Sequence, residues 1–314
     1  MLVLGLHHPE SDLHLDYWER GDTWGQGMMS IALATSALWT GRVDEALQRA
    51  TQARVLFPEG SDPLGSIQAT AVEGRALVVA GRVVEGMRML HDGFAATAPG
   101  HNDHEMLRNA IASAAAVVGD VATAWRVIDE PDALDPDRLG ESDRAVAVAL
   151  THLHDGDPLG AVRLADLVRS PRDTVPDEAG FPWAWAVLAL AVGATGGDAS
   201  VYAAAVEQSA RATYADRALA RAAEACAAAR RGDEDAARDA LERAEAAVPE
   251  GGDRLHPAII AVARAECLSA LGTDDAAEAD DRAARAVAAL GIDPRGWHTV
   301  FGRACGRAPQ PSGA

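Results

Sequence analysis

The sequence predicts an all-α fold, a solenoid of stacked antiparallel helix pairs, from three observations. A short phrase recurs: a glycine, a polar or acidic helix start, then alanines, as in GRVDEALQRATQAR (41–54) and GDEDAARDALERAE (232–245). The glycines that open its copies lie 35 to 41 residues apart, a period typical of repeat arrays. A run with helical periodicity precedes each glycine and another follows it, so about seven helix pairs are expected. The glycines are Gly41, Gly81, Gly119, Gly156, Gly197, Gly232 and Gly272.

The residues at each turn favour two antiparallel helices joined by a short turn. Glycine can end the first helix, because it enters the left-handed region without a Cβ penalty. In four units the next residue is an aspartate, whose carboxylate can cap the exposed N–H groups of the second helix. Pro158 follows one of them at the first helical position, where no N–H is needed. These aspartates are Asp120, Asp157, Asp198 and Asp233.

Small residues at constant offsets from each glycine predict close helix crossings. Only the fifth unit, with Leu190 and Tyr202, departs at both offsets. Seven residues before the glycine stand Ala34, Gly74, Ala112, Ala149, Ala225 and Ala265. Five residues after it stand Ala46, Gly86, Ala124, Ala161, Ala237 and Ala277.

This small–glycine–small spacing resembles the tetratricopeptide repeat, and Pro58 and Pro249 match the closing proline of that family. The resemblance covers about residues 23–290, with units longer than the family's usual 34 or so residues. The stretches GDTWGQGMMSIALATSALWTGRVDEAL and GRALVVAGRVVEGMRML look like the helical-repeat sensor arms of actinobacterial signalling ATPases and LuxR-type, MalT-like regulators. The resemblance implies a superhelix that serves as a regulatory arm.

Composition excludes several classes of chemistry. The chain has no lysine, so a phosphate loop of the form GxxxxGK[ST] and Schiff-base chemistry are excluded. With 47 acidic against 28 basic residues and a net charge of −19, direct binding of nucleic acid is not expected. No GxSxG or CxxC motif and no paired catalytic carboxylates are present. We therefore expect a non-catalytic protein without a cofactor.

Histidines and cysteines are interpreted as structural. The clusters HHPESDLH (7–14) and HNDHE (101–105) lack the HExxH spacing, which favours solvated loops over the alternative of a metal site. Three cysteines, an odd number, disfavour a disulfide framework, and Cys226 and Cys267 are expected to be small packing residues. The absence of a secretory signal or a long apolar run predicts a cytoplasmic protein that does not bind membranes.

The predicted organisation has four parts. Residues 1–22 form a lead-in, which is a candidate truncated repeat, and residues 23–295 form the repeats, with an irregular joint near 166–182. A capping helix at 296–305 follows, because Trp297, Val300, Phe301, Ala304 and Cys305 share one helical face. The tail at 306–314 is expected to be disordered.

A binding groove is expected along the first helices, which line the concave surface of such a superhelix. The resemblance selects positions that are mostly small or apolar, which favours a helix or a peptide of mixed character as the occupant. Partners are therefore predicted to be a protein or peptide, or a small inducer. A stand-alone adaptor or homo-oligomerising scaffold is the alternative. The groove positions are Thr35, Leu38, Gln68, Arg75, Asn109, Ser113, Asp143, Leu150, Leu153, Trp185, Cys226 and Glu266.

Overall fold

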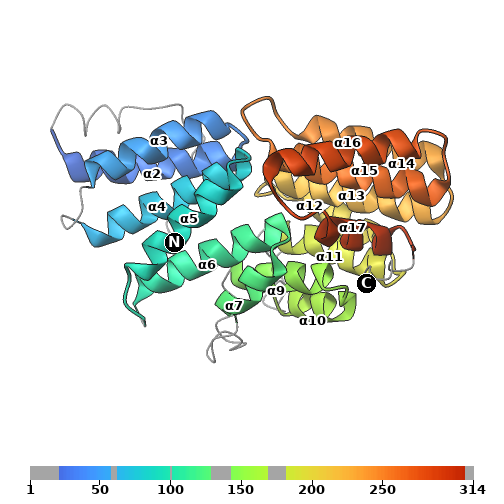
Figure 1. The fold of residues 1–314 in the computed structure, drawn as a ribbon, viewed down its shortest axis with the longest axis horizontal. Coiled ribbons are helices and arrows are strands. Elements are labelled where there is room, and N and C mark those ends of the chain that lie inside the picture. The colour runs from blue at the N-terminus through green and yellow to red at the C-terminus, as the bar shows by residue number, and fades with distance from the viewer. Residues whose placement is uncertain (1–20, 58–61, 100, 129–142, 169–181, 308–314) are drawn as a thin grey trace. The chain divides into compact units, whose positions relative to one another are not determined.

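The computed structural model describes residues 21–57, 62–99, 101–128, 143–168 and 182–307, and this part is all α-helical (Figure 1). It contains fifteen helices and no strand. The predicted lead-in, irregular joint and tail lie almost entirely outside the described residues. None of the described helices is both long and apolar enough to cross a membrane.

The chain divides into two compact units. Unit 1 comprises residues 1–110 and 250–252, and unit 2 comprises residues 111–249 and 253–314. Unit 1 contains α2 (Thr23–Trp39), α3 (Val43–Leu56), α4 (Pro63–Val79), α5 (Val83–Ala95) and the first half of α6 (Asn102–Val118). Unit 2 contains the rest of α6, α7 (Val121–Ile128), α9 (Asp143–His154), α10 (Pro158–Val168), α11 (Pro182–Ala194), α12 (Ser200–Gln208), α13 (Tyr214–Arg230), α14 (Glu234–Ala247), α15 (Leu255–Leu271), α16 (Ala276–Leu290) and α17 (Arg295–Ala304).

Helices that are consecutive in sequence pack as pairs, which fits a helical repeat. The pairs α2/α3 and α4/α5 lie in unit 1, where α2 and α3 also contact α4. In unit 2 the pairs are α9/α10, α11/α12, α13/α14 and α15/α16, and the first helices α11, α13 and α15 contact one another in sequence. At the crossing of α4 and α5, a Cβ added to Gly86 would lie 2.5 Å from the carbonyl oxygen of Gly74. Only glycine permits so close an approach, as the small-residue spacing predicts.

The turn chemistry follows the sequence in most units. Six of the seven predicted glycines have a positive φ, between 69° and 83°, in the left-handed region. In the fifth unit the left-handed residue is Gly196, with φ 84°, and the prediction of Gly197 is wrong. Gly196 is the second residue after the end of α11 at Ala194.

Aspartates begin three of the second helices as predicted. The side-chain oxygens of Asp120, Asp157 and Asp233 accept hydrogen bonds from backbone N–H groups three residues later, at 2.9 to 3.1 Å. The bond from Gly160 lowers the pKa of Asp157. In the fifth unit Asp198 instead accepts from Ser200, two residues later. The aspartate therefore caps the second helix as predicted in three units. In the fifth unit, which lacks the small residues, the aspartate makes a different hydrogen bond.

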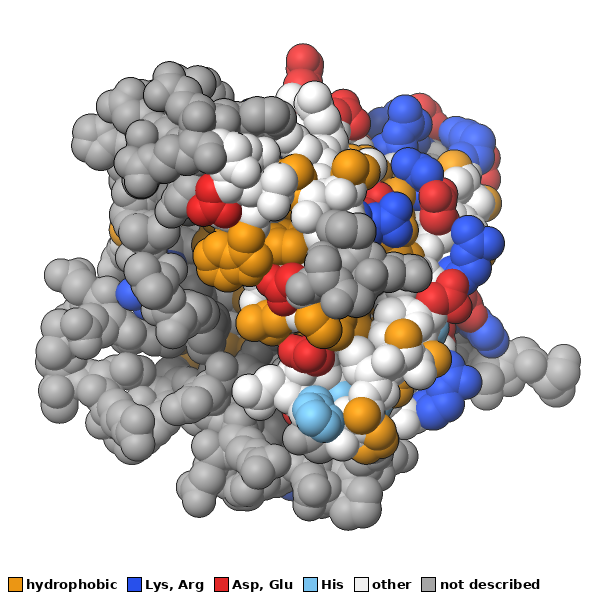
Figure 2. Space-filling view, turned by 90° about the vertical axis from the view of Figure 1, so that its left-hand side faces the viewer, with side chains coloured by type: hydrophobic (Ala, Val, Ile, Leu, Met, Phe, Trp, Pro, Cys, Tyr) orange, Lys and Arg blue, Asp and Glu red, His pale blue; other side chains and the backbone are white. Residues whose placement is uncertain are grey.

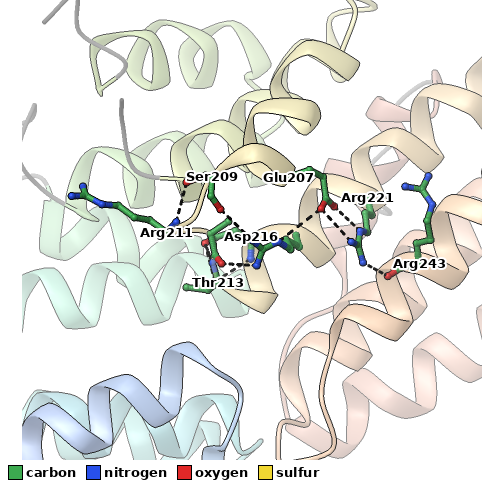
Figure 3. A network of polar contacts seen from close by, with 9 residues as sticks. Glu207, Ser209, Arg211, Thr213, Asp216, Arg221 and Arg243 are labelled. Atoms are coloured by element: carbon green, nitrogen blue, oxygen red, sulfur yellow. Dashed lines mark hydrogen bonds and ion pairs between the residues drawn. The ribbon is translucent and has the colours of Figure 1, made fainter. Parts of the chain in front are cut away.

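Polar contacts hold the irregular connection between α12 and α13 (Figure 3). Thr213 and Asp216 form a capping box at the start of α13, in which each side chain bonds the other residue's backbone N–H. One turn further along, Arg221 donates two hydrogen bonds to Glu207 of α12, at 2.6 and 3.2 Å. The same guanidinium donates to the carbonyl of Arg243 on α14 at 2.8 Å. Arg221 thus ties α12, α13 and α14 together.

Candidate binding grooves

In unit 1 the predicted groove positions are partly exposed. Thr35 and Leu38 lie three residues apart on α2, and Gln68 and Arg75 lie seven apart on α4, so each pair shares a helical face. Each of these four side chains, and that of Asn109 on α6, is half-buried. The helices α2 and α4 are in contact, so the two pairs of groove positions lie on neighbouring helices. Unit 1 therefore offers accessible side chains at these positions.

The N-terminal ends of α2 and α4 add exposed apolar surface to unit 1. Trp24 and Leu64 are 57% and 44% exposed, and the Trp24 indole Nε1 donates to Asp62 at 2.6 Å. A hollow of about 200 Å³ opens here, lined by Thr23, Trp24, Leu56, Phe57 and Asp62. It is smaller than the roughly 300–1,000 Å³ of typical small-molecule pockets. The face in Figure 2, the left-hand side of Figure 1, carries hydrophobic and acidic side chains together.

In unit 2 most of the predicted groove positions are covered. Trp185 is half-buried, and the side chain of Asp143 lies outside the described residues, although α9 begins there. In this unit α17 packs against α9, α11, α13 and α15. The expected capping helix thus contacts four first helices, rather than the end of the last pair alone. The buried positions are Ser113, Leu150, Leu153, Cys226 and Glu266.

Trp297 anchors α17 in this surface. Its side chain is 1% exposed, and its indole Nε1 donates to the carbonyl of Val117 at 2.9 Å. The ring meets His154 of α9 edge to face, with centroids 4.8 Å apart, and stacks on Phe301 at 5.3 Å. Burial lowers the pKa of His154 to about 4, so this imidazole is neutral at physiological pH. Aromatic packing and one hydrogen bond therefore fix the N-terminal half of α17.

Two predicted groove residues lie beside α17 or the residues after it. Glu266 receives the guanidinium of Arg307 at 2.6 Å and lies 2.7 Å from His298 Nδ1. Cys226 is fully buried and lies among the other cysteines of the chain, and its contact with Cys267 raises the pKa of its thiol. At these two positions the structure places a segment of the same chain. Recognition of another molecule at any groove position stays a prediction.

A buried polar cluster that sequence reasoning missed lies between α13 and α15. Tyr214 OH donates to Asp253 Oδ2 at 2.8 Å, and His256 Nδ1 lies 2.7 Å from the same oxygen. Against the effect of burial, the neighbouring His256 lowers the pKa of Asp253. The Asp253 side chain has no exposed surface and also accepts from the N–H groups of Leu255 and His256. The Asp253 carboxylate, one residue before the N-cap Arg254, therefore accepts the first two N–H groups of α15.

Comparison with known proteins does not assign the chain to a family. The chain matches no protein-family model and no curated protein. Its helix-pair packing fits a helical repeat array, while the finer resemblance to tetratricopeptide and LuxR/MalT-like arms remains a prediction.

Proposed function

We propose that the chain is a non-catalytic helical-repeat module that binds a protein or peptide, and that it works as a regulatory or sensor arm of a bacterial signalling or transcription-regulator system. The observation that carries this proposal is α17, an amphipathic helix that packs against the first helices of unit 2. An amphipathic helix that lays its apolar face on a helical surface is a common mode of peptide recognition. The first helices of this chain therefore have the chemistry that such recognition needs.

Unit 1 is the proposed site for a separate partner. Its groove positions on α2 and α4 are half-exposed, whereas most of their counterparts in unit 2 are buried. Leu38 packs beside the buried Ala37, Ala46 and Ala76, so an apolar base continues into the helix pair. Arg75 is another of these positions on α4, and arginine is enriched at binding hot spots. The expected occupant is an amphipathic helix.

The buried polar cluster beside α15 supports a non-catalytic role. The Tyr214, Asp253 and His256 side chains are of types used in proton transfer, but Asp253 is enclosed and engaged in capping α15. A catalytic carboxylate must reach its substrate within hydrogen-bond distance. We therefore propose binding as the activity of this chain, because Asp253 is enclosed and because the sequence contains no catalytic motif such as GxSxG or CxxC.

Arg75→Glu is expected to weaken partner binding by more than about 1 kcal/mol, the loss typical of an interface hot spot. The partner is first captured from a lysate of the source cells by immobilised full-length chain and identified by mass spectrometry. Its purified form is then titrated against each variant by calorimetry. Circular dichroism and melting temperature must stay close to those of the unchanged protein, so that the loss reports on binding.

The matched control is Arg88→Glu, because Arg88 is exposed on α5, the second helix of the same pair. This variant makes the same charge change and should bind the partner normally. A second groove variant, Gln68→Arg, changes the same face of α4 as Arg75 and should also weaken binding. If Arg88→Glu reduces binding while both groove variants bind normally, the site lies on the second helices. That result would favour the adaptor or scaffold alternative.

A further inference from the structure

All three cysteines of the chain meet at one buried point in unit 2. Cys226 lies on α13, Cys267 on α15, and Cys305 directly after α17. The sulfur of Cys267 lies 3.7 Å from that of Cys226 and 3.6 Å from that of Cys305. All three sulfurs lie within 4.8 Å of one another, and the residues are 0%, 0% and 4% exposed.

Packing alone does not account for this convergence. The other small buried positions on α13 are filled with alanine, including Ala225 directly beside Cys226. The cysteines are 41 and 38 residues apart in sequence and come from three different elements. A ligand shared by three sulfurs explains why the chain places all of its cysteines together.

The geometry suits a metal ion coordinated by sulfur. At the usual zinc–sulfur distance of about 2.3 Å, two ligands of a tetrahedral ion lie about 3.8 Å apart. The two sulfur–sulfur distances in the structure, 3.7 and 3.6 Å, are close to this value. Only small side-chain movements are therefore needed to place one ion in contact with all three sulfurs.

The donor set selects the class of ion. The group within reach of one ion consists of three sulfurs and includes no His, Asp or Glu from the part of the chain that the structure describes. Thiolates favour soft ions such as Cu(I) and Zn(II), whereas Mg²⁺ and Ca²⁺ require oxygen ligands. Each ligating thiol gives up its proton to solvent when the ion binds.

We propose that Cys226, Cys267 and Cys305 form a three-thiolate site for a soft, thiophilic metal ion, Cu(I) or Zn(II). Because the ligands come from α13, α15 and the end of α17, the bound ion fastens α17 to two first helices of unit 2. Because the ion binds the folded chain and not the unfolded chain, it stabilises the folded state by mass action. The bound ion therefore also stabilises the position of α17 on the first helices of unit 2.

The test uses the full-length chain, stripped of metal and reduced under nitrogen. It is titrated separately with Zn(II) and with Cu(I), each against a competing chelator, and Co(II) serves as a spectroscopic probe of thiolate ligation. We expect one ion per chain, a cobalt–thiolate charge-transfer band and a higher melting temperature with at least one of the two soft ions. The chelator competition shows which of the two the site prefers. Mg²⁺ and Ca²⁺ should have no effect.

Cysteine variants decide whether the three thiols are the ligands. Cys226→Ser, Cys267→Ser and Cys305→Ala should each weaken binding at least about 100-fold, since even supporting residues around metal sites contribute 10- to 100-fold. Cys305→Ala is the safest of the three for folding, because Cys305 follows the end of α17. Ala220→Ser, a buried change elsewhere on α13, should bind the ion normally. If the folded, reduced protein binds neither ion more tightly than these cysteine variants do, the cluster is inert packing and the proposal is wrong.

Discussion

Trp297→Ala should lower the free energy of unfolding by about 3–5 kcal/mol, the usual cost of removing a buried large aromatic side chain. Trp297 is 1% exposed and contacts His154 and Phe301. Its loss also leaves the carbonyl of Val117 without the indole N–H that it accepts in the structure. Cavity formation and a lost hydrogen bond therefore act in the same direction.

Urea denaturation followed by circular dichroism measures this change in stability. The matched control is Trp39→Ala, since Trp39 is 53% exposed at the end of α2 and its removal opens no cavity. The control should cost much less than the Trp297 variant. Equal losses for the two variants would show that α17 is not held in the core of unit 2 by its tryptophan.

Ala237→Leu is expected to destabilise the protein by about 1–3 kcal/mol through overpacking. Ala237 has no exposed surface and stands five residues after Gly232, at the small position of α14, which packs against α13. A leucine at this position would push these two helices apart, because the interior of a protein has little free volume.

The neighbouring residue provides the control for this change. Ala236 is half-buried, one residue out of phase, and Ala236→Leu makes the same change in volume on a more open part of α14. It should cost clearly less in thermal or urea unfolding. If the two leucine variants lose the same amount of stability relative to the unchanged protein, the small-residue spacing does not mark the helix crossing.

Much of the local structure was predictable, because turns are set by short-range chemistry. The positive φ at six glycines follows from the glycine at the end of each first helix, and the caps at Asp120, Asp157 and Asp233 follow from the aspartate next to that glycine in three units. The error at Gly197 also has a local cause. Two adjacent glycines both tolerate the left-handed region, so the sequence alone does not show which of them ends the helix. The structure selects Gly196.

Contacts between distant segments were less predictable. The apolar face of residues 297–305 was visible in the sequence, but periodicity does not say which helices that face meets. The structure places α17 on α9, α11, α13 and α15. The same limit applies to the cysteines: Cys226 and Cys267 were interpreted as small packing residues, and nothing in their spacing brings Cys305 beside them. Tyr214 and Asp253 are likewise paired only by the fold.

Photo-crosslinking tests the proposed binding face most directly. A photoreactive phenylalanine analogue is introduced into the full-length chain at Leu38, a groove position of α2, and in a separate protein at Val84, which is 75% exposed on α5. Each protein is irradiated with the captured partner, and the adducts are mapped by mass spectrometry. If the first helices of unit 1 bind the partner, the probe at position 38 forms an adduct and the probe at position 84 does not. Adducts at position 84 alone would contradict the account.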